Sequence, residues 1–129
     1  MTSRGLADTS VFIADETGRP IDSTSLPDEL AVSVITIGEL RAGVLAARDT
    51  PILDRRLSTL TAALSLQPIP IDEAVAASWA RLRIALRDAG LRMPVNDSWI
   101  AATAMALDVP LVTQDDDFPS LPDLAVILV

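Results

Sequence analysis

Cysteine and histidine are both absent from the 129 residues of this chain, and all ten of its basic residues are arginine. Without cysteine there is no disulfide framework, no thiolate nucleophile and no cysteine-ligated zinc. Without histidine the chain lacks the side chain best suited to proton transfer near neutral pH, and it cannot form a Ser-His-Asp triad. The absence of lysine excludes lysine-dependent chemistry. Any catalysis must therefore use carboxylates, hydroxyl groups or a bound metal ion.

Long apolar runs are also absent. No stretch of about eighteen uninterrupted apolar residues occurs, and the N-terminal letters MTSRGLADTS lack the basic and then apolar pattern of a secretory signal. We therefore expect a soluble protein of the cytoplasm that does not associate with a membrane. The net charge of −8 argues against general electrostatic adhesion to nucleic acid. A phosphate-bearing substrate would need local positive charge, such as a metal ion.

The residues that are present predict one domain over 1–129, because half of them are hydrophobic and can bury a continuous core. Short apolar strands alternate with amphipathic helices, which indicates an α/β fold. The expected architecture is a three-layer α/β/α sandwich around a mainly parallel sheet. Strands are expected at 4–7, 30–33, 109–113 and 124–129, with an extended piece at 67–71, and helices at 35–47, 51–65, 72–90 and 96–108.

The ends of these helices carry recognisable signals. The first helix follows the strand at 4–7 and can be capped by Asp8, Thr9 or Ser10. Gly90 is expected to end the helix at 72–90, and Asn96 to mark the start of the last one. The buried face of that last helix is expected to contain Ile100, Ala101, Ala104 and Leu107.

Acidic residues follow the expected strands at separate places along the chain. Asp8 follows the first strand, and Glu39 lies in the helix after the second. Asp97 falls in the first turn of the last helix, and Asp115–Asp117 follow the strand at 109–113. In open parallel sheets the functional crevice lies beyond the carboxyl ends of the strands, so these four segments can converge. Carboxylates packed together repel one another unless a cation neutralises them, and oxygen ligands select Mg²⁺ or Mn²⁺.

Other uses of acidic residues each fail on a missing residue. A calcium-binding EF-hand that began at Asp115 would need glycine and glutamate where the chain has Ser120 and Val126. Phosphoaspartyl hydrolases resembling the haloacid dehalogenases need a second aspartate two residues after the first, where Ser10 follows Asp8. They and the response-regulator receivers also need a lysine. Any single carboxylate here could still be an ordinary surface residue.

The segments LADTSVFIA, SVITIGELRAG, NDSWIAATA and LVTQDDDF, in this order and spacing, resemble the PIN-domain nucleases, specifically the VapC toxins of prokaryotic toxin-antitoxin pairs. The resemblance covers nearly the whole chain. It implies a metal-dependent RNA endonuclease that forms a homodimer, is inhibited by a VapB-like antitoxin and meets DNA only through that antitoxin. By this resemblance Asp8 and Asp97 are the principal metal-binding aspartates, Glu39 is the acid of the second motif and Asp115 is the fourth acid.

The end of the last motif leaves open which carboxylate faces the metal. Asp117 stands at a position before a phenylalanine that is also frequently acidic in the family. Alternation along the chain favours Asp115 and Asp117 on one side, with Asp116 a bystander. Ser10 and Thr113 could orient a ligand or a water, and they could equally serve as hydroxyls at a helix start and a strand end.

Arginine and tryptophan supply further candidates. Arg41 comes shortly after Glu39 and could bind substrate phosphate or fix an acidic side chain. Arg83 and Arg87 share one helix face, which we expect to be a solvated surface. Trp79 and Trp99 could stack on bases, but on otherwise apolar helices we expect them in core or dimer packing.

Two functions besides RNA hydrolysis stay open at this point. The first is a catalytically weak binding module that recruits an antitoxin and acts in DNA-bound autoregulation, for which no metal binding would be seen. The second is a small-molecule phosphohydrolase, which would hydrolyse a simple phosphate ester and leave RNA intact. The RNA target is not encoded in a visible motif, because RNA recognition depends on folded shape and exposed loops.

Overall fold

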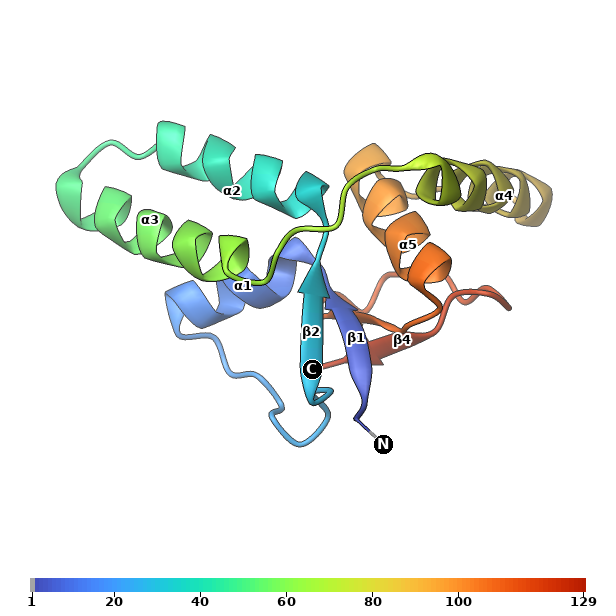
Figure 1. The fold of residues 1–129 in the computed structure, drawn as a ribbon, viewed down its shortest axis with the longest axis horizontal. Coiled ribbons are helices and arrows are strands. Elements are labelled where there is room, and N and C mark those ends of the chain that lie inside the picture. The colour runs from blue at the N-terminus through green and yellow to red at the C-terminus, as the bar shows by residue number, and fades with distance from the viewer. Residues whose placement is uncertain (1) are drawn as a thin grey trace.

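The computed structural model describes residues 2–129; the domain expected over 1–129 includes Met1, which lies outside the described residues. Its strands form one parallel sheet in the order β2-β1-β3-β4, and the predicted α/β fold is confirmed (Figure 1). The strands are β1 (Arg4–Ala7), β2 (Glu29–Val32), β3 (Leu111–Thr113) and β4 (Val126–Leu128). The helices are α1 (Thr9–Thr17), α2 (Val34–Leu45), α3 (Thr50–Leu64), α4 (Glu73–Ala89) and α5 (Val95–Leu107).

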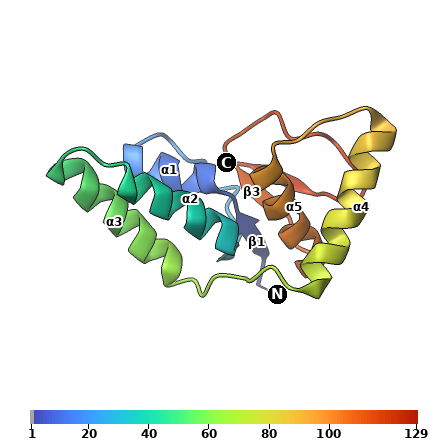
Figure 2. The ribbon, with the colours of Figure 1, turned by 90° about the horizontal axis from the view of Figure 1, so that it is seen from above.

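Helices cover both faces of this sheet, as the three-layer prediction requires. Leu6 and Leu111 are buried in one core cluster with side chains of α4 and α5. Ala7 and Val112, the next residues along the same strands, are buried in another cluster with Val11 of α1. Figure 2 looks down on the molecule and shows α1, α2 and α3 to one side and α4 and α5 to the other. Because both strands are covered on both faces here, consecutive residues are apolar: Leu6 and Ala7 in β1, and Leu111 and Val112 in β3.

The central strand β1 aligns the ends of its neighbours. Ala7 is in register with Val32 of β2 and with Val112 of β3, so the carboxyl ends of the three strands lie side by side. Gly5 allows this close approach, because a Cβ atom there would lie 2.7 Å from Val112 Cγ2 and 2.9 Å from Pro27 Cγ. The residues that follow these strands therefore meet at one edge of the sheet.

Helix ends follow the local signals closely. Of the three candidate caps for α1, Asp8 takes the position, and its side chain accepts a hydrogen bond from the backbone N–H of Ser10. Asp72 caps α4 in the same manner. Gly90 ends α4 as predicted, with the positive φ of 68° that glycine adopts without strain.

Three expectations for the C-terminal third are wrong in detail. Helix α5 begins after Pro94 and not at Asn96, and Leu107 is 40% exposed although it was expected to be buried. The reason is length: α5 spans about 20 Å and the four-residue β1 only about 13 Å, so the last turn of α5 passes the sheet. The strand expected over 124–129 is shorter, and as an edge strand it leaves Leu128 51% exposed.

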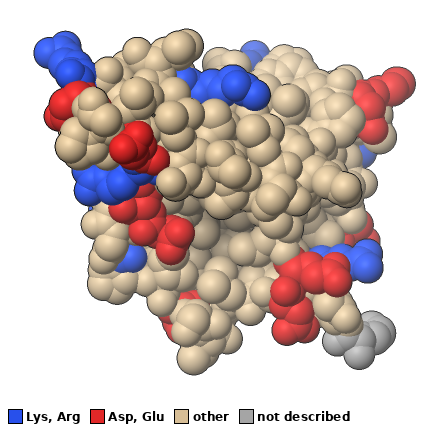
Figure 3. All heavy atoms as spheres, turned by 60° about the vertical axis from the view of Figure 1, so that its left-hand side comes forward, with Lys and Arg blue, Asp and Glu red and all other residues tan. Residues whose placement is uncertain are grey.

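Helices α2 and α3 form a pair that extends away from the sheet (Figure 1). Leu40, Leu60 and Ala63 bury its inner side together with Val32 of β2. Leu45, near the tip of the pair, is 86% exposed. Figure 3 shows the face on this side, where charged side chains lie mainly toward the edges and the centre is uncharged with a hollow. No helix of residues 2–129, this pair included, is long and apolar enough to cross a membrane.

Candidate metal centre

Asp8 lies where β1 passes into α1 and is only 3% exposed. Its Oδ1 accepts hydrogen bonds from the backbone N–H of Ser10, at 2.8 Å, and from the Ser10 hydroxyl. Its Oδ2 accepts a hydrogen bond from Thr113 Oγ1 at 2.7 Å. Burial raises the pKa of Asp8, the hydrogen bonds from Ser10 and Thr113 oppose that rise, and the charge of Asp115 adds to it. The carboxylate is thus held in one orientation by two neighbouring segments.

The two hydroxyls that hold Asp8 also connect α1 to the end of β3. Ser10 Oγ accepts a hydrogen bond from the backbone N–H of Gln114 at 2.9 Å, and Thr113 Oγ1 accepts one from the backbone N–H of Asp115 at 3.0 Å. Ser10 and Thr113 therefore contact the Asp8 carboxylate and fix the start of the triple aspartate. Their predicted role toward a ligand or a water stays a prediction.

Glu39 enters the site from α2 and is held by Thr9, which also contacts Thr36. Thr9 Oγ1 donates a hydrogen bond to Glu39 Oε1 at 2.7 Å and lies 3.0 Å from Thr36 Oγ1. Thr36 is fully buried one turn before Glu39. The sequence interpretation missed both threonines as site residues. The available signals were that Thr9 follows Asp8 directly and that residues three apart in a helix are neighbours.

Asp97, in the first turn of α5, lies close enough to the other acids to be strongly affected by them. Its pKa is raised to about 6, first by burial and then by the negative charges of Asp8, Glu39, Asp115 and Asp117. Charges separated by more than about 10 Å in water are largely screened at moderate salt. Four carboxylates from the segments that follow β1, β2 and β3 therefore lie near enough to Asp97 to act on its charge.

Within the triple aspartate, Asp115 and Asp117 both act on Asp97. Asp116 lines a small hollow on the β4 side, together with Asp115 and Phe118. Because Asp115 lines this hollow too, the alternation that places Asp115 and Asp117 on one side and Asp116 on the other stays a prediction.

Arg41 lies on α2 two residues after Glu39 and is exposed. Residues two apart in a helix do not face the same direction, so Arg41 and Glu39 do not share a helix face. Within residues 2–129 the Arg41 guanidinium forms neither a hydrogen bond nor an ion pair. Its predicted contact with substrate phosphate finds no support in the geometry and stays a prediction.

Within residues 2–129 no arginine forms an ion pair with any of the five carboxylates. The ion pairs within residues 2–129 are Arg4–Glu29 and Arg87–Asp88, and both lie at the surface. In the same range no three acidic side chains converge tightly enough to form a preformed metal site. Mg²⁺ typically binds one or two protein carboxylates directly and keeps several waters. Oxygen donors that form no ion pair within residues 2–129 are therefore of the kind that a hard divalent cation prefers.

The two tryptophans stiffen the helix turn that carries Asp97. The rings of Trp79 and Trp99 stack with centroids 4.3 Å apart and an interplanar angle of 3°. Trp79 Nε1 donates a hydrogen bond to Ser98 Oγ at 3.0 Å, and Ser98 in turn donates to the carbonyl of Val95. Both rings pack against the core cluster of α4 and α5. The structure thus favours packing over a free base-stacking surface for this pair.

Comparison with known proteins adds the family. The PIN domain family model matches residues 6–124, a range that includes all five carboxylates. This chain is a PIN-domain protein. Within the family it belongs with the VapC proteins: Ribonuclease VapC4 of Mycobacterium tuberculosis is 50% identical over 98% of this chain and 97% of its own length. Ribonuclease VapC5 of the same organism is 49% identical over 94% of this chain and 90% of its own length.

Solved structures place this PIN domain in the same group. It matches the crystal structure of the toxin-antitoxin family member VapBC-5 from Mycobacterium tuberculosis with a TM-score of 0.90 and 43% identity, over 98% of this chain and 99% of that chain. It matches VapBC2 from Rickettsia felis, bound to a promoter DNA fragment, with a TM-score of 0.79 and 26% identity, over 95% and 96%. PIN-domain ribonucleases generally depend on a divalent metal, in accord with the donor set described above.

Proposed function

We propose that this PIN domain is a metal-dependent endoribonuclease and the toxin of a toxin-antitoxin pair. The observation that carries the proposal is the acidic surroundings of Asp97: four other carboxylates help to raise its pKa to about 6, and within residues 2–129 no arginine forms an ion pair with any of the five. A protein gains nothing from such repulsion unless a cation binds there. The relatives named as ribonucleases, at about half identity, support RNA as the substrate.

In this proposal Asp8, Asp97, Asp115 and Asp117 hold the cation, which is Mg²⁺ or Mn²⁺ because every donor is an oxygen. When bound, the cation lowers the pKa of the attacking water and offsets negative charge on the phosphodiester. Ser10 and Thr113 keep the Asp8 carboxylate oriented.

Glu39 has a different task in this proposal. Thr9 occupies its Oε1, so the other oxygen, Oε2, is available to accept a proton from the attacking water. Glu39, Asp8, Asp97 and Asp115 are thus the proposed catalytic residues.

The partners follow from the solved relatives. Those chains come from VapBC complexes, one of them bound to promoter DNA. They support a VapB-like antitoxin as the partner of this chain, with DNA reached only through that antitoxin. The homodimer and the cytoplasmic location stay predictions from the resemblance and the composition.

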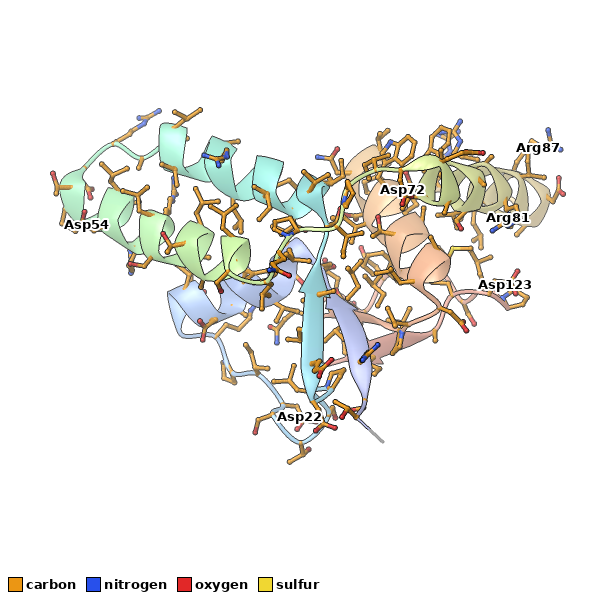
Figure 4. The ribbon with its side chains drawn as sticks, viewed as in Figure 1. Asp22, Asp54, Asp72, Arg81, Arg87 and Asp123 are labelled. Atoms are coloured by element: carbon orange, nitrogen blue, oxygen red, sulfur yellow. The ribbon has the colours of Figure 1, made fainter. Side chains whose placement is uncertain are left out.

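RNA cleavage by the purified chain tests this function. We expect scission with added Mg²⁺ or Mn²⁺ and none with EDTA. Asp97→Asn should lower the rate by about a hundredfold or more, as loss of a metal-site residue does. Asp54→Asn is the matched control, because Asp54 is an exposed residue of α3 at the outer end of the α2–α3 pair (Figure 4).

Four outcomes would contradict the proposal. Undiminished cleavage by Asp97→Asn would remove the acidic centre from the mechanism, and cleavage in EDTA would remove the metal. Absence of both metal binding and cleavage would favour the binding module. Hydrolysis of p-nitrophenyl phosphate with RNA left intact would indicate a small-molecule phosphohydrolase.

A further inference from the structure

A second candidate binding site, separate from the acidic centre, lies between α4 and α5. A hollow of about 340 Å³ opens between the C-terminal half of α4 and the start of α5. Arg83, Arg87 and Arg92 line it, together with apolar side chains that include Leu86 and Met93, and no acidic residue lines it. Three of the ten basic residues thus meet in one cavity of a chain whose net charge is −8. The cavity suits an anion.

The hollow and the acidic centre share one turn of α5. Ser98 lines the hollow, and it directly follows Asp97 in the chain. Successive side chains of an α-helix point about 100° apart, so the two residues present different sides of the same turn. The hydrogen bond from Trp79 Nε1 to Ser98 Oγ fixes this turn against α4. The backbone of α4, which carries Arg83 and Arg87, is therefore packed against the turn of α5 that carries Asp97.

At least two of the three arginines are free to bind a ligand. The Arg83 guanidinium lies 5.1 Å from the centroid of the Trp79 ring, a cation–π contact that orders the side chain and leaves its N–H groups unused. Within the described part of the chain neither Arg83 nor Arg92 forms an ion pair, whereas Arg87 pairs with the exposed Asp88. Figure 4 shows Arg87 at the outer end of α4. Within the described residues the hollow thus presents two arginines without an ion pair, Arg83 and Arg92, of which Arg83 is ordered by Trp79.

We propose that this hollow is a phosphate subsite that binds the backbone of single-stranded RNA beside the acidic centre. The inference rests on the proposed function, because it assigns the hollow to the same RNA substrate. Guanidinium groups bind phosphate oxygens through paired N–H donors, and a positively charged groove that follows the backbone is common to single-strand binding sites. The volume is in the range of sites for small ligands, which suits about one nucleotide.

This subsite solves an electrostatic difficulty of the acidic centre. Five carboxylates repel a phosphodiester chain, and a single divalent cation offsets only part of their charge. Positive charge at the next nucleotide would hold the RNA in place without entering the metal centre. The solvated face expected for Arg83 and Arg87 from the sequence thereby gains a specific ligand.

The test compares two double variants that remove the same charge. Arg83→Ala/Arg92→Ala removes the two unpaired guanidinium groups of the hollow, and Arg48→Ala/Arg55→Ala removes two exposed ones at the α2–α3 end. Both are made in the Asp97→Asn chain, and binding of a fluorescein-labelled single-stranded RNA is measured by anisotropy in Mg²⁺ over a series of salt concentrations. Loss of two phosphate contacts predicts binding weaker by about tenfold or more and a salt slope smaller by about 1.4 for the hollow variant alone.

A second arm uses chains that retain Asp97 and follows RNA cleavage. The hollow variant should raise KM in proportion to the loss of binding, with kcat within about twofold of the parent, because it lacks a contact made equally in the ground state and the transition state. Arg83→Lys/Arg92→Lys, which keeps the charge but not the planar donor pair, should restore part of the binding.

Several results would overturn the subsite. The hollow variant could bind RNA as tightly as the control variant, or both could weaken equally, which would show only an effect of net charge. A poly-glutamate peptide of matched charge could bind as well as RNA and be lost equally in the hollow variant, which would assign the hollow to an acidic protein segment. Failure of the proposed function looks different: the Asp97-containing parent would not cleave RNA with any divalent metal, whatever the two double variants do to binding.

Discussion

The substitution Asp97→Asn should make the metal-free protein more stable at neutral and alkaline pH, although it removes a residue of the proposed site. The pKa of Asp97 is about 6 in the folded chain against 3.8 for an isolated side chain. Between these values the folded state binds more protons than the unfolded state. Stability therefore falls as pH rises through this window and stays lower above it. The difference corresponds to at most about 3 kcal/mol, and screening at this partly exposed carboxylate reduces it to about 1–2 kcal/mol.

Urea unfolding in EDTA measures this effect. Asp97→Asn should exceed the parent by about 1–2 kcal/mol near pH 8 and lose that advantage near pH 4, where the parent carboxyl is protonated. Asp54→Asn, which removes a charge from the exposed face of α3, controls for net charge. Addition of Mn²⁺ should reverse the order, because a ligand at about a hundredfold its Kd stabilises the parent by about 2.7 kcal/mol. An Asp97→Asn chain no more stable than the control near pH 8 would show that the five carboxylates do not repel one another.

Two further predictions concern the frame around the site. Thr113→Val removes the hydrogen bond to Asp8 Oδ2 and should cost about 1–3 kcal/mol in urea unfolding. Thr113→Ser, which retains the hydroxyl, should cost clearly less, and equal losses would refute the role of the bond. Gly5→Ala places a Cβ 2.7 Å from Val112 Cγ2 and should destabilise by about 1–3 kcal/mol. Gly38→Ala lies in a helix with nothing within 4 Å of the new Cβ, and it should instead stabilise the protein by about 0.5–1 kcal/mol. If both glycine substitutions changed stability in the same direction, the close packing around Gly5 would be contradicted.

The position of each acidic segment could be predicted from the sequence because it depends on local pattern and on one topological rule. Apolar runs marked the strands that precede Asp8 and Asp115, and parallel strands place the residues after them at a single edge. Asp97 was placed by the start of the last helix. The choice of Asp8 as the cap of α1 was left open among three residues, since all three side chains can cap a helix and only the register of β1 decides between them.

Contacts between helices could not be predicted in this way. The bond from Thr9 to Glu39 joins α1 to α2, and the contact of Arg83 with Trp79 matters because of where α4 packs on α5. No spacing along the chain specifies how two helices cross. Leu107 shows the same limit, because the apolar period placed it on the buried face while the short sheet leaves that end of α5 uncovered.

Binding of Mn²⁺ to the purified chain, followed by electron paramagnetic resonance, tests most directly whether the five carboxylates form a metal centre. The parent and Asp54→Asn should both bind the ion. Asp97→Asn should bind it at least about tenfold more weakly, as expected for loss of a residue that shapes a metal site. A parent chain that leaves Mn²⁺ free in solution, or an Asp97→Asn chain that binds it as tightly as the parent, would contradict a metal-dependent nuclease centred on these residues.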